Sequence, residues 1–158
     1  MTTEYESPPN DERLATFWVP MQQKSLVVPQ VAIAEVIAHA DLRPDSEAPA
    51  WLLGWLDWRA QSVPVISHEM ANGQSLAADS AGTRLAIFNL LSAQNEALFF
   101  GLRIQGIPRL LRLSEAEVRE DSLAHRAPMQ RMAVITQLGK ASIPDLDALA
   151  GLAATLRR

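Results

Sequence analysis

The chain has 158 residues, of which 48% are apolar and 20% charged, a composition that is typical of a folded globular protein and excludes wholesale disorder. It contains no cysteine, so disulfide bonds, thiolate metal sites and cysteine nucleophiles are excluded. The net charge of −4 is unevenly distributed, because residues 101–158 carry nine basic and six acidic side chains, an excess that can attract an acidic partner.

The amino-terminal segment is polar and acidic, and it contains the structure-breaking sequence Ser7-Pro8-Pro9-Asn10. We expect a disordered tail over residues 1–13 and a single folded unit over residues 14–158. The tail lacks the basic start and apolar core of a secretion signal. No window approaches the roughly 20 apolar residues that span a bilayer. These features predict a cytoplasmic protein that does not insert into the membrane.

Two short apolar runs, Phe17–Met21 and Ser25–Pro29, flank the polar residues 22–24 and predict a first β-hairpin. After Pro29, the apolar residues of Gln30–Ala38 recur at roughly three-residue spacing, which favours a short helix. Residues 41–49, with two prolines and three acids, are expected to form an extended connection.

Residues 49–70 carry three of the four tryptophans, Trp51, Trp55 and Trp58. Two apolar runs meet there at the polar break Arg59-Ala60-Gln61, which predicts a β-hairpin. Arginine at a bend is exposed, so its charge and five donors are available to a partner. The indoles favour the core, and Trp58, beside the bend, is expected to be the most exposed of them.

The returning strand of this hairpin contains Pro64, which cannot donate a hydrogen bond to a neighbouring strand. We therefore expect Pro64 at a sheet edge or a bulge. An edge strand is a place where another protein can dock.

The second half begins after a loop of small and polar residues, Asn72–Gly82. Thr83–Leu91 and Ala97–Arg103 predict two strands around a turn at residues 92–96, and Leu110–Leu113 is a further apolar run.

Ser114 and Glu117 have the spacing of a capping box, which predicts a turn or two of helix, with an irregular loop as the alternative. Arg131–Leu138 and Ala141–Ile143 predict a last hairpin about Gly139-Lys140. A helix over residues 144–157 follows; its apolar line is Leu146, Leu149, Ala150, Ala153 and Leu156. Roughly eight to ten short strands with little helix favour small β-barrels or a β-sandwich over a parallel α/β sheet.

Residues with catalytic or ligand-binding chemistry lack the spacing that such sites need. His39, His68 and His125 are far apart, and each is expected on the surface or in a loop. Neither a nucleophile motif nor a glycine-rich phosphate loop is present. Neighbouring acids such as Glu120 and Asp121 lie in polar segments, and neither a helix-turn-helix nor an aromatic RNA platform is evident. The sequence predicts no enzyme, cofactor, metal site or nucleic-acid partner.

Residues 35–65 resemble the CheW-like coupling proteins of bacterial chemosensory systems. In that family an EV(I/V) segment precedes a proline-bearing linker and a hairpin of the form hydrophobic-Gly-x-x-(N/D)-x-Arg-Gly-x-x-(V/I)-Pro-(V/I). The matching residues here are Glu35-Val36-Ile37, then Pro44 and Pro49, then Leu53–Val65, which reads LGWLDWRAQSVPV. A weaker resemblance covers nearly the whole ordered chain.

The resemblance implies an all-β fold with short helices, in which two five-stranded SH3-like barrels intertwine. The first barrel would cover about residues 14–75 and the second about 83–143. It also implies a non-catalytic adaptor, which couples the cytoplasmic tip of a methyl-accepting chemoreceptor to the regulatory domain of a CheA-type histidine kinase and is recruited to receptor arrays.

Site residues follow from position in the family motif. Arg59 matches the motif arginine, and Glu35 matches the acid that lies close to it, so the resemblance implies an ion pair beside the receptor groove. The apolar neighbours of this receptor site would be Val27, Val28, Val36 and Trp58. The kinase contacts would be Gly54, Ala60 and Gln61.

Several residues depart from the family pattern. Ala60 replaces a glycine, so the bend either changes its turn type or is strained, because alanine is disfavoured at positive φ. Ser67 replaces an aspartate, Asp57 and Trp58 replace the asparagine and leucine of the bend, and Gly101-Leu102-Arg103 lacks the usual acid. These departures favour a divergent member with altered partners, such as one from a pilus-motility (twitching) pathway.

Two alternatives stay open at this point. One is a diverged small-barrel module that scaffolds or inhibits another signalling enzyme without binding a receptor. The other is a small hydrolase with dispersed carboxylates, which would need a deep pocket with converging polar groups.

Overall fold

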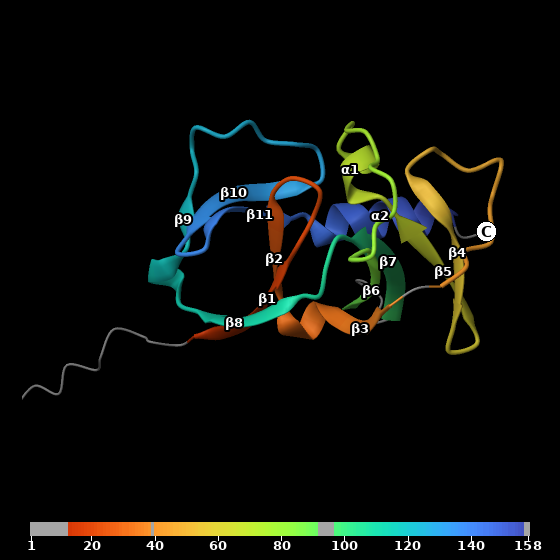
Figure 1. The fold of residues 1–158 in the computed structure, drawn as a ribbon, viewed down its shortest axis with the longest axis horizontal. Helices are drawn as coiled ribbons and strands as arrows, with labels where there is room; N and C mark the ends of the chain where they lie inside the picture. Colours follow the sequence, from red (N-terminus) through yellow and green to blue (C-terminus); the bar gives the residue numbers. More distant parts are fainter. Residues whose placement is uncertain (1–12, 39, 92–96, 157–158) are drawn as a thin grey trace, which may run out of the picture.

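The computed structural model describes residues 13–38, 40–91 and 97–156. Two curled β-sheets lie side by side along the longest axis of the molecule, the six-stranded one on the left of Figure 1 and the five-stranded one on the right. Residues 1–12 of the tail predicted over residues 1–13, His39 and the turn at residues 92–96 lie outside the described part of the chain.

The six-stranded sheet contains, in spatial order, β8 (Arg109–Leu113), β1 (Leu14–Val19), β2 (Ser25–Pro29), β11 (Gly139–Pro144), β10 (Gln130–Thr136) and β9 (Arg119–Glu120). The five-stranded sheet contains β3 (Ile33–Ile37), β6 (Arg84–Leu91), β7 (Ala97–Ile104), β5 (Gln61–Ile66) and β4 (Leu52–Trp58). The helical elements are η1 (Gln30–Ala32), α1 (His68–Ala71), η2 (Glu115–Glu117) and α2 (Leu146–Leu156).

The two sheets exchange chain segments. The first two strands of the chain pair with strands from its last third, and β2 runs parallel to β11. Residues 14–75 and 83–143, the ranges expected for two barrels, therefore each contribute to both sheets. The expected fold class, an all-β chain with two intertwined barrel-like units, is confirmed, with six strands rather than five in one unit.

Apolar side chains fill the space between the sheets as well as the interior of each. The largest cluster joins β1 and β2 to β5, β6, β7 and α2. Helix α2 contributes Leu149, Ala150 and Ala153 to it, at the spacing of one helix face. The helix begins at a side-chain cap, where Ala148 N donates to Asp145 Oδ1 at 3.0 Å. None of the helices in the described ranges is long and apolar enough to cross a bilayer.

The helix predicted over residues 30–38 is wrong. A single 3-10 turn is followed by strand β3, which pairs with β6 and places Glu35 opposite Ile87 and Val36 opposite Ala86. Three-residue apolar spacing over so short a segment does not separate helix from strand. Pairing with a buried strand decides the outcome, because β-branched residues fit a pleated surface well.

Three further outcomes concern turns and edges, and two of them differ from the prediction. The last hairpin turns at residues 137–138 rather than at Gly139-Lys140. The capping box of Ser114 and Glu117 is confirmed and closes a single 3-10 turn. The predicted edge position of Pro64 is wrong for the strand as a whole, since β5 lies between β4 and β7. Proline is tolerated there because β7 pairs only with Val65 and Ile66.

Candidate functional site

The bend between β4 and β5 consists of Arg59 and Ala60, whose φ angles are +48° and +60°. Positive φ at both central residues is the geometry of a type I′ hairpin turn, which is normally occupied by Asn-Gly or Gly-Gly. A residue with a Cβ atom costs about 1–2 kcal/mol in this region. The bend thus keeps a tight turn at a cost in strain, and strained residues of this kind concentrate at functional sites.

Arg59 is held by two neighbours. Its guanidinium lies over the ring of Trp58, 4.4 Å from the centroid, and its Nη2 is 4.0 Å from Oε2 of Glu35. Trp58 Nε1 donates a hydrogen bond to the same Oε2 atom. The Arg59 and Glu35 side chains are 65% and 45% exposed. An ion pair in such contact with water contributes about 1 kcal/mol or less to stability, so its main effect is to orient the arginine.

Trp58 is only 6% exposed, so the expectation that it is the most exposed tryptophan is wrong. Its ring packs on Phe99, 5.0 Å between centroids, and its N–H is satisfied by Glu35. A buried indole whose N–H has an acceptor is stable in the core. Trp51 and Trp55, the other two tryptophans of the segment, are half-buried.

The residues expected at the receptor site fall into two groups. Glu35, Trp58 and Arg59 lie together, because Glu35 contacts both of the other side chains. Val36 is partly exposed on the edge strand β3, where successive side chains alternate, so it faces the opposite side of the sheet from Glu35. Val27 and Val28 are buried in β2 of the other sheet and are not part of this group. Val27 and Val28 line a separate apolar groove of about 470 Å³, together with Leu14, Leu113, Val118 and Ile143.

The residues expected at the kinase contact also separate. Ala60 and Gln61 are exposed at the bend beside Arg59. Gly54 is buried, with φ of +149°, and a Cβ atom there would lie 2.7 Å from Leu42 Cβ and 2.9 Å from the Arg43 carbonyl oxygen. Gly54 therefore permits the close approach of residues 42–43 to β4, which is a packing role.

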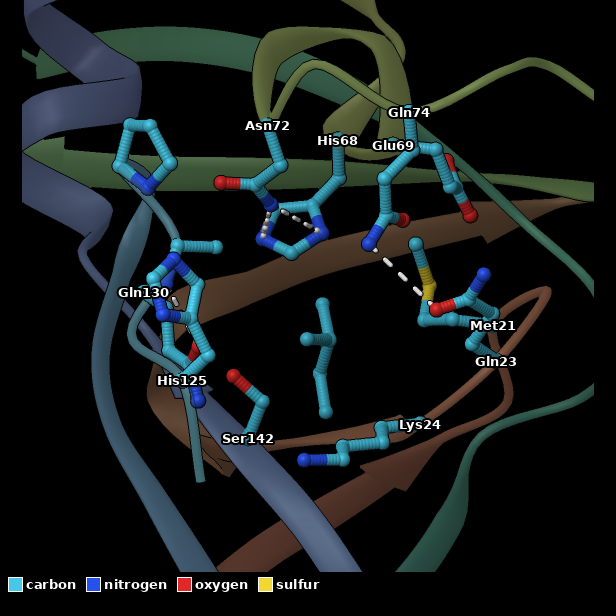
Figure 2. Close-up of a pocket in the computed structure, with 13 residues that line it drawn as sticks. Met21, Gln23, Lys24, His68, Glu69, Asn72, Gln74, His125, Gln130 and Ser142 are labelled. Atoms are coloured by element: carbon cyan, nitrogen blue, oxygen red, sulfur yellow. Dashed lines mark hydrogen bonds between the residues drawn. The ribbon is translucent and has the colours of Figure 1, made fainter. Parts of the chain in front are cut away.

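A polar hollow of about 370 Å³ lies where α1 meets the loop before β10 (Figure 2). His68 and Asn72 lie on one side of it, and His125, Ser142 and Lys24 lie around the other. The Asn72 side chain accepts from Met129 N at 2.7 Å, a contact between segments far apart in the chain. The sequence spacing of the two histidines gives no sign that they share this hollow.

His68 is buried, so its expected place on the surface is wrong. Burial lowers its pKa, and the neighbouring Glu69 carboxylate and a hydrogen bond with the Met129 backbone oppose that shift. Glu69 is buried as well, and it accepts from Gln22 N at 3.4 Å. These contacts hold α1 against the hairpin of β1 and β2. The hollow is therefore lined by polar contacts between segments that are far apart in the sequence. Within the described ranges, no three His, Asp or Glu side chains form a group that could hold a metal ion.

The chain was compared with known proteins. The family model of the CheW-like domain matches residues 15–153. Among solved structures, the chain is similar to the scaffolding protein TtCheW from Thermoanaerobacter tengcongensis, with a TM-score of 0.70 and 14% sequence identity over 84% of this chain and 88% of that chain. At this identity the likeness concerns the fold. No curated protein sequence matches the chain.

Proposed function

The chain belongs to the CheW-like domain family, and from this membership we propose that it is a non-catalytic scaffold of a chemosensory pathway. In the finer form of the proposal, it couples the cytoplasmic tip of a methyl-accepting chemoreceptor to the regulatory domain of a CheA-type histidine kinase within a receptor array. The family match over most of the folded chain supports the scaffold role.

The observation that carries the finer proposal is the presentation of Arg59. The strained two-residue turn places Arg59 at the tip of the hairpin. Its guanidinium packs on the Trp58 ring and pairs with Glu35, while 65% of the Arg59 side chain stays exposed. Such an arrangement lowers the entropy lost when the arginine binds an acceptor, because its orientation is set beforehand. We assign Arg59 to the receptor contact, together with the exposed Val36 of the edge strand β3.

The kinase contact is assigned to the exposed side of the bend, at Ala60 and Gln61. Gly54 takes no direct part, because it is buried. The replacement of the family glycine by Ala60 supports a divergent partner, as in a pilus-motility pathway.

The test measures binding of the full chain, separately, to a receptor signalling-tip fragment and to a kinase regulatory domain. Arg59→Glu is expected to weaken receptor-tip binding more than tenfold, because it reverses the charge at the contact. The matched control is Arg119→Glu, on the exposed β9 edge of the other sheet, which should bind as the natural chain does. Equal receptor-tip binding by the Arg59 and Arg119 variants would contradict the assignment. Binding to the kinase domain alone would favour a scaffold without a receptor contact.

A further inference from the structure

Two apolar grooves adjoin on the six-stranded sheet, where β2 and β11 stop pairing. These two strands run parallel and pair at two positions, Ser25 with Ala141 and Leu26 with Ser142. Past these pairs lie the groove of about 470 Å³ described above and a smaller groove of about 240 Å³. They form one surface, which we call the β2–β11 groove, because they share four wall residues: Val27, Val28, Pro29 and Ile143.

One wall of the β2–β11 groove exposes a large apolar side chain to water. Leu14, the first residue of β1, lines the groove and is 70% exposed. Leu113 and Val118 continue the same apolar wall. A continuous apolar surface with an uncovered leucine is typical of a place where another segment docks.

The polar groups of this wall favour an occupant that donates a hydrogen bond. Thr16 donates to the Leu111 carbonyl oxygen at 3.1 Å, and Ser114 Oγ donates to Glu117 at 2.9 Å, so both hydroxyl donors are used. Glu115 lines the groove and is exposed, and its carboxylate has no partner within the described part of the chain. An apolar wall with an acceptor at its rim matches a tyrosine side chain, which has an aromatic ring and one O–H donor.

A segment with such a side chain begins at the edge of the groove. Residues 1–12 precede β1 and lie outside the described ranges. They contain Tyr5, the single tyrosine of the chain. Arg13 Nη1 lies 3.1 Å from Glu117 Oε1. This ion pair holds the start of β1 against η2, the turn that carries Glu115.

The segment is long enough to reach every part of the groove. Tyr5 is nine residues before Leu14, which is about 30 Å in an extended chain. Strand β2 separates β1 from β11, so the groove extends over two strand spacings, about 10 Å. The remaining length allows the chain to turn back on itself.

We propose that residues 1–12 fold back onto the β2–β11 groove, with the Tyr5 ring on its apolar wall and the Tyr5 O–H donating to Glu115. Glu4 and Glu6 flank Tyr5, and the exposed Arg131 on the wall of the smaller groove is the cation that they can meet. Because the segment is tethered, its effective concentration is in the millimolar range, so a weak contact covers the groove for about half of the time or more. A partner of this surface must then displace Tyr5. The groove belongs to the other sheet from Arg59, and the proposal does not rest on the adaptor role.

The first test observes Tyr5 in the full chain. Labelling with 3-fluorotyrosine gives one ¹⁹F resonance, because the chain has a single tyrosine. The reference is the labelled peptide of residues 1–12. In the full chain the resonance should have a different chemical shift, and a soluble gadolinium chelate should broaden it about twofold less than in the peptide, or less still. A resonance with the shift and broadening of the peptide overturns the proposal.

Variants of the groove then locate the contact. Val118→Glu places a charge on the apolar wall, far from Tyr5 in sequence, and should move the ¹⁹F resonance to the peptide value. The control is Leu138→Glu, at a 44% exposed position in the β10–β11 turn and outside both grooves, which should leave the resonance unchanged. If Val118→Glu does not fold, Leu14→Ser, at a 70% exposed position, decides in its place. An unchanged resonance in the groove variant, or the same change in the control, contradicts the assignment.

The contact is also measured from the side of the groove. Tyr5→Ala should shift the backbone amides of Val27, Leu113 and Val118, whereas Thr2→Ala, in the same segment, should not. Amides that stay in place in Tyr5→Ala would show that Tyr5 does not cover the groove.

Dilution separates the chain's own segment from that of a second copy. For an intramolecular contact, the ¹⁹F resonance of the full chain should stay the same over a hundredfold dilution. A return to the peptide value on dilution assigns the groove to a second copy and overturns the proposal. These measurements need neither receptor nor kinase, so their failure is distinguishable from failure of the adaptor role.

Discussion

The five-stranded sheet carries an arginine–carboxylate pair at each end, and the two pairs differ in the burial of the arginine and in the distance between the charges. Arg59 and Glu35 are both exposed, 4.0 Å apart, and supported by an indole. Arg103 and Asp79 are 2.8 Å apart, with the arginine buried and the acid on the surface. The exposed pair gains little from its charges because water screens them. In the other pair, the desolvated arginine makes the loss of its carboxylate costly.

Gly54→Ala should have the largest effect on stability, because it disturbs the contact of Leu42 with β4 at the Arg103 end of the sheet. Left-handed strain and a Cβ only 2.7 Å from Leu42 Cβ should lower the free energy of unfolding by about 3 kcal/mol. Urea denaturation measures it. The control Gly151→Ala, at an exposed helix position with open space around it, should add about 0.5–1 kcal/mol. Unchanged stability with lost kinase binding would restore Gly54 as a docking residue.

Asp79→Ala and Glu35→Gln test the two pairs directly. Removing Asp79 leaves the buried Arg103 cation without its carboxylate and should cost about 1–3 kcal/mol. Glu35→Gln keeps an acceptor for the Trp58 N–H and should cost less than about 1 kcal/mol. Both values come from chemical denaturation at the same pH. The reverse order of costs would contradict the contrast between the two ends.

Ala60→Gly should stabilise the Arg59 end by about 1 kcal/mol, since glycine adopts φ of +60° without a steric penalty. The control is Ala154→Gly, in the exposed face of α2, which should lose about 1 kcal/mol. Thermal or urea unfolding reports both. A loss of stability in Ala60→Gly would mean that the bend is not strained.

His68 extends the comparison to a buried group whose charge depends on pH. Burial lowers its pKa in the folded chain, so the unfolded chain binds the proton more tightly and stability falls as pH drops below about 6.5, the ordinary histidine value. The stability is fully present above that pH. His68→Gln should reduce the loss of stability between pH 7.5 and 5.5, measured by urea denaturation. An identical loss in both chains would contradict the assignment.

Local patterns predicted the hairpins well. Alternating apolar residues and turn signals located β1–β2, β4–β5 and β10–β11, because these signals act between neighbours in sequence. The family motif brought Glu35 and Arg59 together correctly, although it could not show that Glu35 lies on a strand. The spacing of apolar residues over residues 30–38 predicted a helix wrongly, since pairing with β6 makes most of this segment a strand.

Long-range packing accounts for what the sequence could not show. The burial of Trp58 depends on Phe99, and the separation of Val27 and Val28 from the bend depends on which sheet β2 joins. Arg103 stands out in the sequence as a charged residue inside an apolar strand. Its partner Asp79 could not be predicted, because it lies in a loop whose sequence has no regular pattern. The shared hollow of His68 and His125 left no local trace at all.

Receptor-tip affinity of a charge-swap series tests most directly the claim that Arg59 itself meets the partner. Arg59→Glu should weaken binding more than tenfold with less than about 1 kcal/mol change in unfolding free energy. The double variant Glu35→Arg with Arg59→Glu restores opposite charges across the pair, yet it should remain as weak as the single variant, because the arginine at the bend is still missing. Full recovery of binding in the double variant would contradict the claim and assign Arg59 a purely structural role.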